Sequence, residues 1–239
     1  MNLFKKVKNY FTNRECKISL PTDRVREIIK KHNVSDWFFY AFINRCERRH
    51  ICEPSLWILN NLPKERVIFE TGCGCGLNLV WFAQKGFSHL MGSDISDEVI
   101  LAGKEIVQLA NSNIKLWQDD GLTPTRLPGK IDVLLALNWT YHVDNFELKL
   151  FLDIYSMILN KGGFLIIDFI DDSYNSNPNN LYLTSDWTKP IEVRKPSEYK
   201  IRYSYEQIVS DIKNSGYEIY HTMKHEQIIP RVVYVLCKN

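Results

Sequence analysis

Short apolar runs alternate with helical patterns from Leu62 to the end of the chain. This alternation is typical of βαβ units, in which helices connect parallel strands and cover both faces of one sheet. Seven runs are predicted as strands: residues 67–70, 89–94, 114–117, 131–137, 164–169, 218–222 and 232–237. Helices are predicted near residues 77–84, 97–110, 144–159 and 204–216. The pattern therefore indicates a doubly wound α/β fold.

The length of 239 residues, 45% of them hydrophobic, allows one substantial core. We expect one main domain over residues 63–239, preceded by a helical N-terminal cap over residues 1–62. Residues 171–200 are rich in Asn, Ser, Asp and Pro and are too long for an ordinary connection, which predicts an insertion on the substrate side. We expect a cytoplasmic protein, because the sequence shows neither a membrane-spanning run nor a signal peptide.

The charge is unevenly distributed, although the net charge is only +2. Residues 1–50 contain 12 Lys and Arg against 5 Asp and Glu. Phe4, Val7 and Phe11 stand among lysines, a spacing that suits a basic amphipathic helix on an anionic membrane surface. The alternative, which we prefer, is a solvated helix whose apolar side packs on its own protein.

The six cysteines do not form the pattern of a disulfide framework, so we expect reduced thiols. Cys46, His50 and Cys52 are close enough in sequence to suggest a metal site. They lack a CxxC pair and a fourth ligand, so we expect no metal there and interpret them as residues of a helix.

A glycine-rich segment, Glu70-Thr-Gly72-Cys-Gly74-Cys-Gly76, follows the first predicted strand and precedes a helix. Glycines at such a place allow a sharp turn and the close approach of a ligand. The spacing is GxGxG, and Leu77 and Leu79 stand where the dinucleotide pattern GxGxxG requires a small residue. Nicotinamide or flavin binding is therefore the weaker interpretation.

Acidic residues follow the next two predicted strands. Asp94 ends the second strand, where a carboxylate can accept hydrogen bonds from both hydroxyls of a ribose. Asp119-Asp120-Gly121 follows the third strand and offers an acceptor for an adenine amino group, although the same residues are also common in ordinary turns.

Residues 63–239 resemble the class I, Rossmann-like methyltransferases, which bind S-adenosylmethionine. The resemblance implies a seven-stranded, mostly parallel sheet with an antiparallel last strand. In that family the glycine loop contacts the methionine part, the acid after the second strand binds the ribose, and the acid after the third strand binds the adenine. Asp120 is the preferred adenine acid and Asp119 the alternative. The resemblance thus assigns cofactor binding to Glu70, Gly72, Gly74, Gly76, Asp94, Ile95, Asp119, Asp120, Gly121 and Asn138.

Methyl transfer mainly requires alignment, which can contribute about 7–11 kcal/mol, and a base when the acceptor is protonated. The acceptor is expected to approach the ends of the fourth and fifth strands, where the sequence is Asn138-Trp-Thr-Tyr141-His142. This segment lacks the prolines of the Asn-Pro-Pro-Tyr motif found in methyltransferases that act on planar nitrogens. His142 is the candidate base because its ordinary pKa lies near neutrality, and Tyr141 is the second catalytic candidate.

We expect the acceptor to be a small molecule methylated on O or N, such as a sugar, a phosphorylated metabolite or a natural-product intermediate. The aromatics of residues 37–40 and of the insertion could wall its pocket. RNA or protein methylation is an alternative, although the sequence shows no RNA-binding module and nucleic acid is the less favoured partner. A cofactor-binding protein without activity is the third hypothesis. Tyr182, Trp187 and Tyr199 are the aromatics of the insertion, and core packing is the alternative for them. Arg194, Lys195, Lys200 and Arg202, in or beside the insertion, could neutralise a phosphate or carboxylate on the acceptor, although we prefer a solvated loop.

Overall fold

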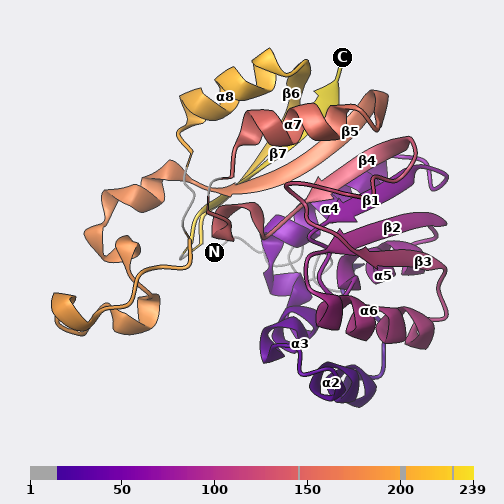
Figure 1. Ribbon diagram of the computed structural model, residues 1–239, viewed down its shortest axis with the longest axis horizontal. Helices are drawn as coiled ribbons and strands as arrows, with labels where there is room; N and C mark the ends of the chain where they lie inside the picture. Colours follow the sequence, from indigo (N-terminus) through magenta and orange to yellow (C-terminus); the bar gives the residue numbers. More distant parts are fainter. Residues whose placement is uncertain (1–14, 145, 200–202, 228) are drawn as a thin grey trace, which may run out of the picture.

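The computed structural model describes residues 15–144, 146–199, 203–227 and 229–239. Its centre is one seven-stranded sheet in the order β3-β2-β1-β4-β5-β7-β6 (Figure 1). The strands are β1 Val67–Thr71, β2 His89–Asp94, β3 Ile114–Gln118, β4 Ile131–Ala136, β5 Leu159–Ile170, β6 Tyr217–His225 and β7 Arg231–Lys238. The pairs from β3 to β5 are parallel, whereas β7 is antiparallel to both β5 and β6. This is the predicted sheet, with its antiparallel last strand.

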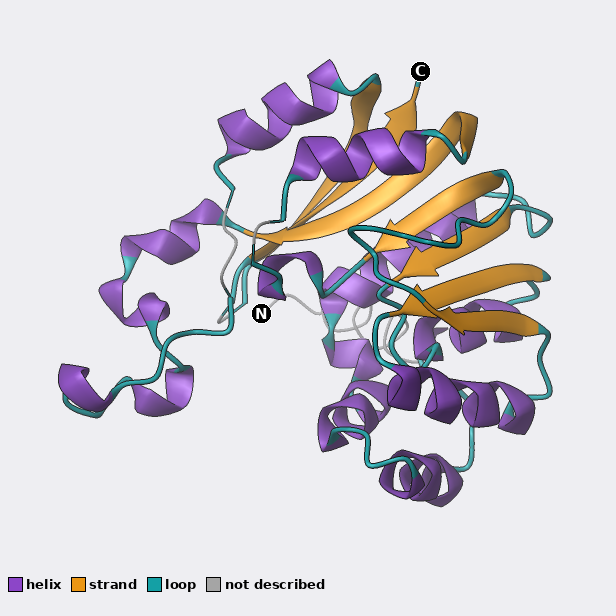
Figure 2. Cartoon of the chain, in the orientation of Figure 1, coloured by secondary structure: helices purple, strands orange, loops and turns teal. Residues whose placement is uncertain are grey.

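Helices cover both faces of the sheet (Figure 2). One face carries α7 and α8, and the other carries α5, α6 and the helices that precede β1. Neighbouring residues of β4 show the division: Val133 and Leu135 belong to one apolar cluster, and Leu134 to the other. The helices are α2 Thr22–Lys31, α3 Asp36–Ile43, α4 Arg49–Asn61, α5 Leu77–Gln84, α6 Asp97–Leu109, α7 Leu148–Ser156 and α8 Tyr205–Asn214, with the 3-10 turns η1 Arg45–Glu47 and η2 Thr140–His142.

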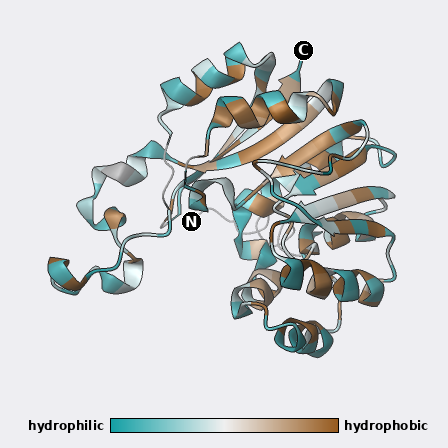
Figure 3. Ribbon diagram, in the orientation of Figure 1, coloured by the Kyte–Doolittle hydropathy of each residue, from teal (hydrophilic) through white to brown (hydrophobic). Residues whose placement is uncertain are grey.

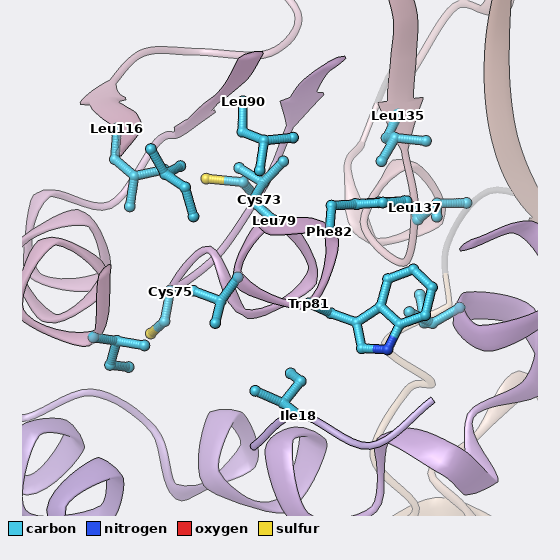
Figure 4. Close-up of a cluster of buried hydrophobic side chains, with 14 of the residues drawn as sticks. Ile18, Cys73, Cys75, Leu79, Trp81, Phe82, Leu90, Leu116, Leu135 and Leu137 are labelled. Carbon is cyan, nitrogen blue, oxygen red and sulfur yellow. The ribbon is translucent and has the colours of Figure 1, made fainter. Parts of the chain in front are cut away.

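The N-terminal helices are packed onto the sheet domain. Figure 4 shows Trp81 of α5 among the buried side chains that separate Ile18 from the strands. Trp81 is fully buried and its Nε1 donates a hydrogen bond to the carbonyl of Glu15 at 3.0 Å. In addition, α2 packs on α6, and α4 packs on β6 and β7. Hydrophobic residues accordingly concentrate on the strands and on the inner sides of the helices (Figure 3).

The structure corrects the predicted boundaries around α7 and β5. The helix begins at Leu148, not at Asp144, and ends at Ser156, and the strand begins at Leu159, before the predicted turn. The carboxylate of Asp132 explains the longer strand. It accepts hydrogen bonds from the Val67 backbone at 2.9 Å and from the Asn160 side chain at 3.0 Å, which holds the start of β5 beside β4.

The described part of the insertion extends away from the sheet domain as a chain of short 3-10 turns (Figure 1). These are η3 Asp172–Ser176, η4 Pro178–Leu181, η5 Thr184–Asp186 and η6 Ile191–Val193. Buried Asp186 stabilises the segment by pairing with Lys189 and accepting the backbone N–H of Lys195 at 2.9 Å. Trp187 Nε1 donates a hydrogen bond to the backbone carbonyl of Tyr182. This bond joins two of the residues that were predicted to contact the methyl acceptor.

Several sequence predictions concern residues outside the described part of the chain, namely Phe4, Val7, Phe11, Lys200 and Arg202. The described residues form no disulfide bond. No group of three metal-ligating side chains occurs among the described residues. Within the same ranges, no helix is both long enough and apolar enough to cross a membrane.

Candidate functional site

The glycine loop turns sharply between β1 and α5. Gly72 and Gly74 have φ angles of +64° and +56°, in the left-handed region that costs other residues about 1–2 kcal/mol. Neighbouring side chains also approach closely. A Cβ on Gly72 would lie 2.4 Å from the Trp139 ring, and one on Gly74 would lie 2.6 Å from the Phe38 ring. Both positions therefore require glycine for conformation and for space.

Asp94 joins the end of β2 to this loop. Its Oδ2 accepts the backbone N–H of Gly74 at 2.9 Å, and its Oδ1 accepts the N–H of Ser96 at 3.1 Å. Burial raises the pKa of the Asp94 carboxyl, and these hydrogen bonds oppose the rise. The parallel pairing of β1 with β2 brings the two strand ends together, as the positions of the loop and the acid in the sequence predicted.

A cavity of about 160 Å³ lies beside the glycine loop, at the carboxyl ends of β1 and β4. The strand order reverses at this point, since the chain runs outward from β1 to β3 and returns to β4 on the other side. Open α/β sheets bind their ligands at such a reversal. The N-terminal helices form one wall. The cavity is lined by Trp37, Phe38, Ala41, Arg48, Ile51, Glu70, Gly72, Cys73, Gly74, Cys75, Leu77, Asn78, Asp94, Leu137, Asn138 and Trp139.

Glu70 presents a buried carboxylate to this cavity. Its Oε1 accepts a hydrogen bond from the Asn78 side chain at 3.1 Å, whereas Oε2 is buried without a hydrogen-bond donor in the described part of the chain. Burial raises the pKa of Glu70 to about 8. A buried carboxylate oxygen without a donor is costly, so this oxygen is suited to a cationic ligand group.

The two acids after β3 serve their own loop. Asp119 accepts backbone hydrogen bonds from Thr125 and Arg126, both at 2.9 Å, and Asp120 accepts one from Leu122 at 2.8 Å. Burial opposes ionisation of Asp119, but these hydrogen bonds outweigh it and lower the pKa. Neither acid lines the cavity, and Ile95, beside Asp94, is 66% exposed. Asp119 and Asp120 thus stabilise the turn after β3, which the sequence analysis gave as the alternative to adenine binding.

Asn138 organises the segment after β4. Its backbone, with φ of +67°, donates a hydrogen bond to Asp168 at 2.6 Å. Its side-chain oxygen accepts a hydrogen bond from the Tyr141 hydroxyl at 2.8 Å and lies 3.1 Å from His50 Nε2. Tyr141 is fully buried, and burial raises its pKa. The Tyr141 hydroxyl therefore holds Asn138 in place.

His142 lies in η2, next to the Tyr141 ring, with ring centroids 4.5 Å apart. Its Nδ1 is 3.3 Å from the carbonyl oxygen of Glu198, and Tyr199 covers the ring at 5.5 Å. Burial lowers the pKa of His142, which favours the neutral ring at pH 7. His142 does not line the cavity.

A buried ion pair that no sequence pattern predicted lies next to this segment. Arg231, the first residue of β7, contacts the carboxylate of Asp168 at 3.1 Å and lies 4.1 Å from the centre of the Tyr141 ring. The sequence contains no local signal for it, because the partners lie 63 residues apart and meet through sheet pairing. His50, one of the suspected metal ligands, instead faces Asn138.

Comparison with known proteins agrees with this geometry. A family model described as a methyltransferase domain matches residues 68–163, which include the glycine loop and Asp94. A putative protein N5-glutamine methyltransferase of Methanocaldococcus jannaschii is 34% identical over 85 residues, 35% of this chain and 42% of the relative. Residues 68–163 are therefore a class I methyltransferase domain.

Further methyltransferases share parts of the sequence or the fold. The ribosomal protein L11 methyltransferase of Caldanaerobacter subterraneus is 27% identical over 109 residues, 45% of this chain and 33% of the relative. The chain thus spans less than half the length of these two curated relatives. The magnesium protoporphyrin IX methyltransferase of Synechocystis with bound SAH has a TM-score of 0.62 at 19% identity, covering 81% of this chain and 84% of its own. A methyltransferase of Methanosarcina mazei reaches 0.63 at 17% identity, covering 76% and 96%.

S-Adenosylmethionine is the cofactor of this family, and the cavity fits it on two observations. The unpartnered Oε2 of Glu70 suits the ammonium of the methionine part. The glycine loop and the carboxylate of Asp94 line the same cavity, as the methionine part and the ribose of one ligand require.

Proposed function

We propose that the chain transfers the methyl group of S-adenosylmethionine to an O or N atom of a small-molecule acceptor. The hydrogen bond between Gly74 and Asp94, beside a cavity at the reversal of strand order, is the observation that carries the proposal. In this proposal the glycine loop binds the methionine part and Asp94 binds the ribose. Asp120, Ile95 and Gly121 stay the candidates for the adenine side.

The bound cofactor supplies a methyl group on a positively charged sulfur, which is already activated for in-line displacement. The protein's part is to align the acceptor with that methyl group and to exclude water, and alignment alone can contribute about 7–11 kcal/mol. Trp139 and Phe38 pack against the glycine loop and would keep water from it. We therefore propose that the N-terminal helices act as the cap of the reaction site.

His142 is the proposed base for an acceptor that must lose a proton. Its lowered pKa leaves the ring neutral and able to accept a proton at pH 7. Tyr141 is proposed to position Asn138, since its hydroxyl is already engaged there. His142→Gln should lower kcat by about 10²–10⁴-fold with an acceptor that needs deprotonation, without changing cofactor affinity. An unchanged kcat with such an acceptor would remove the base role.

A small-molecule acceptor is supported by the N-terminal helices, whose Trp37, Phe38 and Ala41 form a wall beside the loop. A protein acceptor is the second candidate. It is favoured by the insertion, which extends from the domain and exposes Leu181, Ile191 and Val193, and by the named acceptors of the curated relatives.

Transfer of labelled methyl groups tests these candidates. The purified protein is incubated with methyl-labelled S-adenosylmethionine and either a metabolite fraction or a protein fraction. Asp94→Ala, which should bind the cofactor less tightly, serves as the control with reduced transfer at low cofactor concentration. We expect label in small molecules. Label confined to protein would establish the second candidate. Micromolar binding of S-adenosylhomocysteine without transfer to either fraction would identify a cofactor-binding protein instead.

A further inference from the structure

Arg48 lines the cavity and forms no ion pair with the acids of the described residues. The residue lies between η1 and α4, is partly buried, and packs 4.8 Å from the centre of the Trp37 ring. Its neighbours are engaged: Arg45 donates hydrogen bonds to Ser55 and Asn78, and Arg49 pairs with Glu53. For Arg48, the described part of the chain provides no ion pair within 4.0 Å.

Asp168, a buried carboxylate that lowers the cost of the Arg48 charge, already has a partner. Asp168 pairs with Arg231 at 3.1 Å and accepts the Asn138 N–H at 2.6 Å. The negative charge of Asp168 thus acts on two guanidinium groups, those of Arg48 and Arg231. Burial lowers the pKa of Arg48, and the nearby charge of Arg231 lowers it further. A buried charge without a partner is expensive, so the site favours an incoming anion.

In the same cavity, Glu70 lacks a hydrogen-bond donor for one of its oxygens among the described residues. Its buried Oε2 has no donor in the described chain, and it feels the positive charge of Arg48. The cavity is therefore lined by a carboxyl group with one oxygen that has no donor and by an arginine without an ion-pair partner among the described residues. The complementary ligand group is a zwitterion that carries an ammonium and a carboxylate, which is the α-amino acid end of S-adenosylmethionine.

We propose that Arg48 binds the α-carboxylate of the cofactor, while Glu70 binds its ammonium. This assignment rests on the proposed function. Arg48 precedes the segment matched by the family model, residues 68–163, so the N-terminal helices would complete the cofactor site. The rival source of a carboxylate is an acidic acceptor, and the experiment separates the two.

Calorimetry with two ligands provides the test. S-Adenosylhomocysteine carries the amino acid group, and 5′-methylthioadenosine has the same nucleoside without it. Arg48→Gln should weaken S-adenosylhomocysteine roughly 10- to 100-fold and leave 5′-methylthioadenosine unchanged. Arg48→Lys should restore part of the affinity, because it keeps the charge. Arg49→Gln is the matched control, since the adjacent Arg49 pairs with Glu53, and it should bind both ligands as the unmodified protein does.

Two results would overturn the assignment of Arg48 alone. Equal weakening of both ligands would show that Arg48 only supports the fold of the site. An unchanged affinity of Arg48→Gln for S-adenosylhomocysteine would leave an acidic acceptor as the source of the carboxylate. If the unmodified protein bound neither ligand, the proposed function would fail together with this assignment.

Discussion

The carboxylate of Asp94 accepts the backbone N–H of Gly74 at 2.9 Å, so the end of β2 holds the glycine loop that follows β1. The two residues are 20 positions apart, and parallel pairing of the strands brings them into contact. The same carboxylate lines the cavity. Asp94 thus shapes the loop and faces the space where the cofactor is proposed to bind.

Asp94→Ala should weaken the binding of S-adenosylhomocysteine by about 1–3 kcal/mol, because charge-assisted hydrogen bonds to the loop and to the ribose are lost. Titration calorimetry measures the change. Asp97→Ala is the control, since Asp97 is exposed in the first turn of α6 and should leave affinity unchanged. Equal affinity of Asp94→Ala and the unmodified protein would contradict the proposed site.

Two glycine substitutions distinguish the effect of backbone strain from the effect of a steric clash. They are Gly74→Ala and Gly162→Ala. Both glycines have positive φ, at +56° and +69°, so each alanine should cost about 1–2 kcal/mol in urea unfolding. Only the Cβ at position 74 meets a neighbour, the Phe38 ring, whereas position 162 is open. Gly74→Ala should therefore also lose affinity for S-adenosylhomocysteine. If Gly162→Ala lost affinity equally, contact with the ring would not be the cause.

Glu70 predicts a pH dependence of stability without ligand. Burial raises its pKa to about 8 in the folded protein, against about 4.3 in an unfolded chain. The folded state binds the proton more tightly, so this contribution is complete at pH 4 and is lost as the pH rises through about 8. Glu70→Gln should flatten the decrease in unfolding free energy between pH 5 and 9, measured with urea. Parallel curves for the two proteins would contradict the raised pKa.

An ammonium beside Glu70 should reverse this preference for the proton. Binding of S-adenosylhomocysteine at pH 7 should release a proton from Glu70, since the cation favours the ionised carboxylate. Calorimetry in buffers of different ionisation enthalpy measures the release. Glu70→Gln should not release that proton, and 5′-methylthioadenosine should not cause its release in either protein. Equal release with both ligands would place the proton elsewhere.

Arg231→Met should destabilise the fold by about 3–5 kcal/mol, because Asp168 would stay buried without its cationic partner. Asp168 is fully buried, and the pair spans β5 and β7. Arg24→Met is the control: its pair with Glu27 is exposed and should contribute about 1 kcal/mol or less. Urea unfolding compares the variants. Similar losses for both would show that the buried pair adds little.

Local patterns predicted the parts of the fold that depend on neighbouring residues. The apolar runs and turn residues located the ends of β1 and β2, and Ser204 opens α8 by accepting the Gln207 N–H, as its spacing predicted. The start of β5 could not be predicted in this way. It depends on Asp132, which lies 28 residues before Asn160 and binds it across the sheet.

The sequence by itself determined the order of strands and helices, the glycine loop and the acid at the end of β2. Each depends on periodicity or on the conformational freedom of single residues, which are local properties. Only the tertiary structure decided that Asp119 and Asp120 bind their own loop, that Tyr141 is buried against Asn138, and that Arg48 and Glu70 line one cavity. These outcomes depend on which side chains form hydrogen bonds and ion pairs with each other after packing. The partners are far apart in the chain, so local sequence patterns do not identify them.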